Sequence, residues 1–224
     1  VIEVNPRSSR TIPYISKVTG VPIIDLATKV MLGQKLKDLG YGTGIYPEAS
    51  YYAVKMPVFS FEKLTDVDTG LGPEMKSTGE CLGLAESFPQ ALLKAFKGAN
   101  LKAPKKGGRM IITVKDEDKE EIVGIARGFY DMGIEILATS GTCKVLNEAG
   151  IPARWVARVS EAHPNILDMI ASGTVDLVIN TPTRGRRHDT DGFKIRRSTV
   201  EHSVACITAI DTARAMLTVR AQGR

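Results

Sequence analysis

Residues 110–139, MIITVKDEDKEEIVGIARGFYDMGIEILAT, decide the fold of the second half of this chain. They begin with a short apolar run, Met110 to Val114, which has the length of a buried strand. Apolar residues then recur at the spacing of one helix face between Asp118 and Met132, namely Ile122, Ile125, Ala126 and Phe129. A second apolar run, Ile134 to Thr139, follows. This strand–helix–strand order predicts the first unit of a parallel sheet.

The same alternation continues to the C-terminus. Further strands are predicted at residues 153–156, 175–180 and 205–207, and further helices at residues 142–149, 165–172, 198–203 and 211–222. Five short strands alternating with helices predict an α/β fold: a five-stranded parallel, doubly wound sheet with helices on both faces. Ligands of such sheets bind beyond the carboxyl ends of the strands.

The first hundred residues lack this alternation of strands and helices. The pattern predicts helices at residues 11–33, with a break at Gly20 and Pro22, and at residues 88–96, and strands at residues 2–4 and 51–61. Residues 98–108 are rich in Gly, Pro and Lys and indicate a linker. We therefore predict an α+β region at residues 1–100, with too few strands to close a sheet of its own, a linker at 101–108 and the α/β domain at 109–224.

Composition restricts the partners and the location of the protein. The 224 residues are 43% hydrophobic and 25% charged, with a net charge of +5, which favours anionic partners such as nucleotides, phosphates or nucleic acid. Three cysteines without a CxxC pair indicate reduced thiols in a cytosolic protein. Apolar runs fall far short of the roughly 20 residues that cross a bilayer. We therefore expect a cytoplasmic protein with no membrane partner.

The opening segment carries a candidate metal site. Alternate residues of a strand point to the same side, so Glu3 and Asn5 would present a carboxylate and an amide oxygen together. Such hard oxygen ligands suit Mg²⁺. Arg7 and Arg10 follow, and their guanidinium groups would hold phosphate oxygens. Taken alone, the same pattern also fits an ordinary solvated strand end.

Two further stretches stand out by their composition. Residues 72–80, GPEMKSTGE, read as a surface loop. Residues 138–142, ATSGT, follow a strand and open a helix, and the free backbone N–H groups of such a position predict a phosphate cradle. The alternative is plain N-capping of the helix by Thr139 or Ser140.

Residues 180–187, NTPTRGRR, leave the fourth strand of the domain at the same end of the predicted sheet. Lys119, near the start of the first helix, and Arg158, just after the third strand, reach the same edge. Four elements therefore converge on one predicted anion site. Residues 184–197 form a basic cluster that would alternatively contact nucleic acid, but no interleaved aromatic residues accompany it, so we rank that partner last.

In combination, these motifs resemble one family. EVNPRSSR (3–10), GVP (20–22), LGPEMKSTGE (71–80), ATSGT (138–142) and INTPTRGRR (179–187) occur in that order over essentially the whole chain. They resemble the C-terminal part of the large subunit of carbamoyl phosphate synthetase. The last two motifs resemble loops of the methylglyoxal-synthase-like regulatory domain that ends that subunit.

For the first region, the resemblance implies the end of the second ATP-grasp half, which uses ATP and Mg²⁺ to phosphorylate carbamate. It implies that Glu3 and Asn5 are the metal ligands and that Arg7 and Arg10 are catalytic, neutralising charge on the transferred phosphoryl group. The chain alone would lack most of that half and would not turn over. Its implied partners are the remainder of the large subunit and a glutamine amidotransferase small subunit.

For the second region, the resemblance implies an allosteric domain that binds a nucleotide monophosphate, UMP or IMP. The matching positions for phosphate and ribose are Lys119, Thr139, Thr142, Arg158 and Asn180, with Thr181 and Thr183 nearby. Three departures bear on base preference. Arg158 stands where the family pattern has lysine, which changes the donor geometry. Ser140 stands where a histidine is expected, and the loop at Asn180 is one residue longer than in the family pattern.

Some family members also bind ornithine at the domain junction through an acidic residue and a tyrosine. The matching positions here are Met56 and Cys206. We therefore predict that this activator site is absent.

Two other functions stay open. A stand-alone phosphate lyase of the methylglyoxal synthase type needs a carboxylate inside the phosphate site, and the sequence offers only Asp189 and Asp191, some way beyond Asn180. The other is a non-enzymatic module that binds anions or nucleic acid. For residues 1–100 we also expect exposed apolar surface, which self-association would cover.

Overall fold

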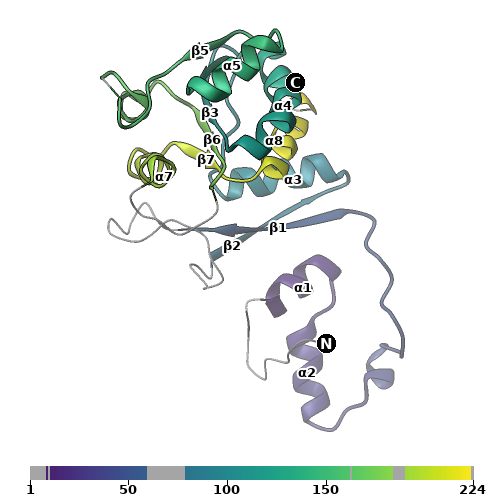
Figure 1. The fold of residues 1–224 in the computed structure, drawn as a ribbon. Coiled ribbons are helices and arrows are strands. Elements are labelled where there is room, and N and C mark those ends of the chain that lie inside the picture. The colour runs from purple at the N-terminus through teal and green to yellow at the C-terminus, as the bar shows by residue number, and fades with distance from the viewer. Residues whose placement is uncertain (1–8, 10, 60–78, 162, 184–189, 223–224) are drawn as a thin grey trace.

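The computed structural model describes residues 9, 11–59, 79–161, 163–183 and 190–222 of the chain. In this part, no helix combines the length and the apolar character that a membrane crossing requires. The described strands form two separate sheets, one of two strands and one of five (Figure 1).

The larger sheet confirms the predicted fold class. Its strands are β3 (Arg109–Thr113), β4 (Glu135–Ala138), β5 (Ala153–Trp155), β6 (Leu177–Asn180) and β7 (Ala205–Ile207). All neighbours pair in parallel, in the order β5-β4-β3-β6-β7. The first strand in sequence therefore lies in the middle of the sheet, and the chain adds strands first on one side of it and then on the other.

Helices cover both faces of this sheet. Residues of α4 (Lys119–Asp131), α5 (Ser140–Glu148) and α8 (Ile210–Gln222) share one core cluster. Residues of α6 (Ile166–Ala171) and α7 (Asp191–Glu201) share the other. Figure 1 shows α7 on one side of the strands, with α4 and α8 on the other. A short 3-10 turn, Asp116–Asp118, leads from β3 into α4.

The alternation of side chains along β3 explains why both faces carry helices. Met110 and Ile112 belong to the core on the α4, α5 and α8 side, whereas Ile111 belongs to the core on the α6 and α7 side. None of the three side chains is exposed to solvent. A strand that is apolar on both faces needs cover on both, and this is the condition under which parallel sheets are stable.

The first region contains α1 (Thr11–Thr19), α2 (Ile23–Met31), a 3-10 turn (Leu36–Leu39), β1 (Tyr52–Val58), β2 (Gly79–Ala85) and α3 (Phe88–Gly98). The predicted break between α1 and α2 is present, because Gly20 adopts φ +73°. The predicted strand at residues 2–4 lies outside the described residues.

Two expectations about local structure were wrong in part. Gly79 and Glu80, taken as the end of a loop, begin β2, which pairs with β1 in antiparallel register. The helix expected at residues 198–203 is α7, which begins seven residues earlier in the chain, at Asp191. Its start is set by Thr190, whose side chain accepts a hydrogen bond from the Phe193 N–H.

The exposed apolar surface expected in the first region is confirmed. Within α1 and α2, Leu26 is the single buried side chain. Met31 and Leu32 are 79% and 78% exposed, and Ile45 is 99% exposed. Self-association through this surface stays a prediction.

Helix α3 joins the first region to the large sheet. It packs on β1, β2 and α8, and its Leu92 and Phe96 belong to the same core cluster as β3. Gly83 of β2 allows the close approach of α3, because a Cβ there would lie 2.0 Å from the Ala91 carbonyl oxygen. Packing therefore continues across residues 101–108, and the division into domains at that segment stays a prediction.

Successive side chains of β1 point to opposite sides of the strand, and the two sides contact different elements. Val54 and Met56 pack against the core that contains α3. Lys55, on the other side, lies with its Nζ 5.5 Å from the ring centre of Tyr14 in α1. The β1–β2 pair thus has α3 on one side and α1 toward the other (Figure 1).

Replacing Phe96 with Ala should lower the free energy of unfolding by about 3–5 kcal/mol, because Phe96 is 2% exposed and its removal leaves a cavity in the shared core. Phe88, in the same helix, is 50% exposed, so Phe88→Ala should cost less than about 1.5 kcal/mol. Urea denaturation measures both values. Equal losses would contradict the packing of α3 in this core.

The two glycines inside α4 should respond differently to alanine. A Cβ at Gly124 meets no atom within 4 Å, so Gly124→Ala should raise stability by about 0.4–1 kcal/mol. A Cβ at Gly128 would lie 2.6 Å from the Leu217 side chain in α8, so Gly128→Ala should be the less stable variant by about 1–3 kcal/mol. Thermal unfolding of the pair checks the difference, and a more stable Gly128→Ala would contradict the α4–α8 contact.

Candidate anion-binding site

A cavity of about 210 Å³ opens at the carboxyl edge of the large sheet. Five residues predicted from the sequence line it: Lys119, Thr139, Thr142, Arg158 and Asn180. They come from α4, from the β4–α5 junction, from α5 itself, from the loop after β5 and from the end of β6. The structure therefore brings these five residues to one place.

Topology explains the position of the cavity. After β3 the chain adds β4 on one side with α4 on one face, and it later adds β6 on the other side with α6 and α7 on the opposite face. The loops that leave β3 and its neighbours therefore diverge. This divergence opens a crevice beyond the carboxyl ends of the strands, where ligands of open α/β sheets bind.

Lys119 supplies positive charge at the start of α4. Its Nζ lies 2.5 Å from Asp116 Oδ1, and 24% of its side chain is exposed. The Lys119 ammonium group, through a hydrogen bond and its charge, holds the pKa of the Asp116 carboxyl below its ordinary value, and Arg158 adds to the effect. A Cβ at Gly141 would lie 2.8 Å from Lys119 Nζ, so the glycine leaves room for this ammonium group beside the start of α5.

The start of α5 has no side-chain cap. Thr139 occupies the N-cap position, but its side chain caps no N–H group of the helix. Its hydroxyl instead donates to Thr113 Oγ1 at 3.2 Å. The N–H groups of the first turn thus keep their positive partial charge for an anion. The alternative of N-capping was wrong for Ser140, which lies inside the helix, whereas Thr139 does occupy the N-cap position but makes no capping hydrogen bond through its side chain.

The remaining predicted threonines differ in role. Thr142 is 2% exposed, and its Oγ1 accepts a hydrogen bond from the Val114 N–H at 3.4 Å. Thr181 accepts from the Lys115 N–H at 3.0 Å and ties the β6 loop to the β3 loop. Neither Thr181 nor Thr183 is among the described residues that line the cavity.

Arg196 of α7 was missed by sequence reasoning, although it orients Asn180. It donates to Asn180 Oδ1 at 2.6 Å, and Asn180 Nδ2 lies 3.5 Å from the Thr113 carbonyl oxygen. Gly192, one helical turn before Arg196, lies against this pair, because a Cβ there would be 3.1 Å from the Arg196 guanidinium group. No local sequence signal points to the Arg196–Asn180 contact, because it joins a helix and a strand that only the packing of the domain brings together.

Two carboxylates also border the cavity. Asp116 and Asp191 are among its lining residues, and Asp191 begins α7. The site therefore combines the cations Lys119 and Arg158 with acidic groups and is not uniformly positive.

Other predicted positions lie elsewhere. Glu3, Asn5, Arg7 and Arg10 fall outside the described residues, as does Asp189. Met56 lies in β1 opposite Cys81.

Cys206 lies in β7, where burial raises the pKa of its thiol to about 11. The absence of the activator site stays a prediction for both Met56 and Cys206.

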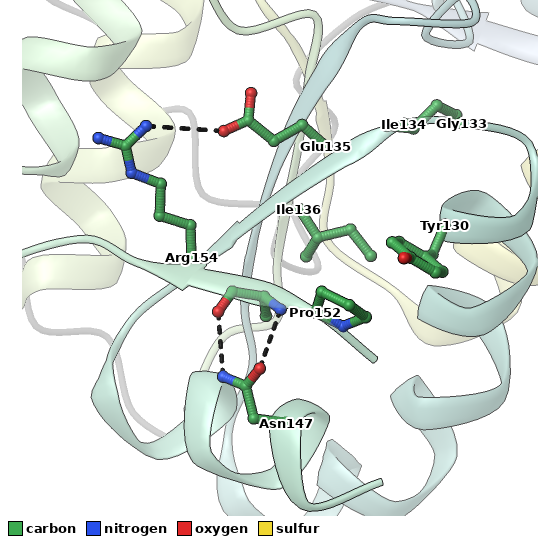
Figure 2. A pocket seen from close by; sticks show the side chains of 9 residues that line it. Tyr130, Gly133, Ile134, Glu135, Ile136, Asn147, Pro152 and Arg154 are labelled. Atoms are coloured by element: carbon green, nitrogen blue, oxygen red, sulfur yellow. Dashed lines mark hydrogen bonds and ion pairs between the residues drawn. The ribbon is translucent and has the colours of Figure 1, made fainter. Parts of the chain in front are cut away.

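A second cavity, of about 550 Å³, lies at the opposite end of the sheet. Figure 2 shows the Asn147 side chain bonded to the backbone of edge strand β5, where it accepts from Ala153 N–H and donates to Ala153 O. Arg154 lies 3.8 Å from Glu135, which also pairs with Arg109 at 2.8 Å. The charged side chains at this cavity pair with one another, and the Asn147 side-chain amide bonds to the otherwise unpaired edge of β5. The polar groups at this cavity are therefore explained by their structural role at the sheet edge.

Two family profiles match the chain. Residues 121–208 match the family described as MGS-like domain, and residues 1–39 match the family described as carbamoyl-phosphate synthase L chain, ATP binding domain. The first match spans β4 to β7 and includes four of the five predicted lining residues.

Curated relatives match nearly the whole chain. The carbamoyl phosphate synthase large chain of Lachnoclostridium phytofermentans is 57% identical over 218 residues, which is 97% of this chain and 20% of that protein. The carbamoyl phosphate synthase large chain of Clostridium perfringens is 50% identical over 223 residues, which is 100% of this chain and 21% of that protein. The chain thus spans about a fifth of the length of these relatives.

A solved structure, methylglyoxal synthase from Elizabethkingia anophelis, is 22% identical, with a TM-score of 0.42 over 51% of this chain and 78% of that one.

The pKa of the Asp116 carboxyl should rise toward its ordinary value in Lys119→Gln, because the ammonium group that lowers it is removed. Carbon-detected NMR titration of the two proteins measures the change. A lowered folded pKa stabilises the protein above the ordinary carboxyl pKa, and this contribution is lost as pH falls through the folded pKa. Lys144→Gln, at a 76% exposed lysine of α5, is the matched control. An unchanged Asp116 titration in Lys119→Gln would contradict the assignment.

Proposed function

The chain belongs to the family of carbamoyl phosphate synthase large chains, whose C-terminal part it matches, and we propose that its α/β domain binds a nucleoside monophosphate, UMP or IMP, as an allosteric effector. The observation that carries the proposal is the convergence of Lys119, Thr142, Arg158 and Asn180 on one cavity. The family membership supports it, because the MGS-like profile covers the same elements.

The chemistry of the cavity favours a phosphate group. Lys119 and Arg158 provide two cations, and hydrogen bonds from such groups to phosphate oxygens are stronger than neutral ones. The uncapped first turn of α5 adds backbone donors with the positive end of the helix dipole behind them. Asn180, held by Arg196, keeps its amide group in one orientation and would bind a phosphate or ribose oxygen.

The size of the cavity favours partial enclosure of a nucleotide. Its volume of about 210 Å³ is below the roughly 300–1,000 Å³ of pockets that enclose drug-sized ligands. The cavity would therefore enclose the phosphate and part of the ribose, and the base would extend outside it.

For a large chain of the relatives' length, we propose ATP-dependent phosphorylation of carbamate. Glu3 and Asn5 would hold Mg²⁺, and Arg7 and Arg10 would neutralise the transferred phosphoryl group. The match of residues 1–39 to an ATP binding domain supports this. Its partners would be the rest of the large chain and a glutamine amidotransferase small subunit. The 224-residue chain by itself would bind the effector without turnover.

One observation favours a second function, that of a phosphate lyase acting on a triose phosphate. Asp116 and Asp191 border the cavity, so carboxylates are available beside the proposed phosphate site. One carboxylate would accept a proton from the carbon next to the carbonyl group, and the resulting enediolate would expel phosphate as the carbon–oxygen bond breaks. We rank this function second because Asp116 is already ion-paired with Lys119 and is therefore less available to accept a proton.

Calorimetric titration of the full chain with UMP and with IMP tests the first function. Binding should be measurable, and Lys119→Ala should weaken it about tenfold or more, because a hydrogen bond to a charged group is lost. Lys144→Ala removes the same charge from an exposed position of α5 and should leave affinity unchanged. If neither nucleotide binds at millimolar concentration, the proposal is wrong.

Incubation with dihydroxyacetone phosphate tests the second function. The expected result is no release of methylglyoxal or inorganic phosphate above the uncatalysed rate. Product formation that disappears in Asp191→Asn would instead establish the lyase and reverse the order of the two functions.

A further inference from the structure

Trp155 is the single tryptophan of the sequence, and 56% of it is exposed to solvent. It is the last residue of β5, the edge strand of the large sheet. Large aromatic side chains contribute most to the stability of a fold or a complex when their surface is buried. An indole ring left open beside a predicted ligand site is therefore a candidate contact for that ligand.

The indole ring is held in place although it is exposed. Its Nε1 donates a hydrogen bond to Ser140 Oγ at 3.1 Å. Ser140 is the first residue of α5, so the bond attaches the ring to the helix end that borders the anion cavity. The polar atom of the indole is satisfied by the protein, and more than half of the residue stays exposed to solvent.

Register places Trp155 next to the cavity. It is paired with Ala138 across the β4–β5 ladder, and Thr139, the next residue of that strand, lines the cavity. Three residues after Trp155, Arg158 lines it as well. Trp155 is therefore close in the fold to two segments that line the cavity, although it is not itself among the described lining residues.

We propose that the indole ring of Trp155 stacks on the base of the bound nucleotide, an inference that rests on the proposed effector function. The cavity is too small to enclose a whole nucleotide, so the base extends beyond it, and a flat aromatic surface anchored at its border fits this need. Stacking on an aromatic ring accepts any base, since every base has a π face. The larger overlap of a bicyclic base makes the site bind IMP more tightly than UMP.

Ser140 has a positioning role in this arrangement. Its role is indirect: its hydroxyl oxygen accepts the hydrogen bond of the indole N–H and so fixes the rotation of the ring. A side chain without an acceptor at this position would leave the ring free to rotate away, so Ser140→Ala should weaken nucleotide binding less than Trp155→Ala does.

The experiment titrates the full chain with ribose 5-phosphate, UMP and IMP, following heat and the fluorescence of Trp155. Both nucleotides should quench the fluorescence, and ribose 5-phosphate should bind with little quenching. Trp155→Ala should lose about tenfold in affinity for IMP and less for UMP, while its affinity for ribose 5-phosphate stays unchanged. Trp155→Phe should retain most of the nucleotide affinity.

Tyr130→Ala is the matched control, because Tyr130 is a 38% exposed aromatic residue at the cavity on the opposite end of the sheet (Figure 2). It should change none of these affinities. Ribose 5-phosphate binding by Trp155→Ala also verifies that this variant is folded.

Two results would overturn the inference in distinguishable ways. Equal nucleotide affinity in the parent protein and Trp155→Ala, or nucleotide binding without a change in fluorescence, rejects the stacking role and leaves the effector function standing. Absence of heat with all three phosphate compounds rejects the effector function, and the stacking role with it.

Discussion

Two rows of backbone hydrogen bonds along β3 hold the rest of the structure in place. The strand pairs in parallel with β4 on one side and with β6 on the other, so that Ile112 lies level with both Ala138 and Ile179. Because the three strands run in one direction, their carboxyl ends reach the same edge. Residues at or just after the ends of β3, β4, β5 and β6 then line one cavity, which no single segment could form.

The apolar side chains of the same strand determine what covers the sheet. Met110 and Ile112 face one core and Ile111 faces the other, so helices are required on both faces. The core on the α8 side also takes in Leu92 and Phe96 of α3. As a result the β1–β2 pair, although it forms a separate sheet, is attached to the domain that carries the cavity.

Two side chains that line the cavity, Lys119 and Asn180, are held by protein partners. Lys119 is paired with Asp116, and Arg196 is bonded to Asn180. Such partners reduce the ordering that a ligand must impose on binding. They also lower the affinity for a phosphate, since it must compete with the Asp116 carboxylate for the ammonium group of Lys119.

Periodicity and the position of polar residues after strands were enough to predict the α/β class, the five parallel strands and five residues that line the cavity. The sequence by itself did not reveal β2, the start of α7, the contact of Arg196 with Asn180 or that of Trp155 with Ser140. Periodicity and turn residues act over a few neighbouring positions, whereas these contacts join residues that only the packing of separate elements brings together. Tertiary structure alone decided which side chains meet, because the strand order places β5 beside β4 and α7 beside β6.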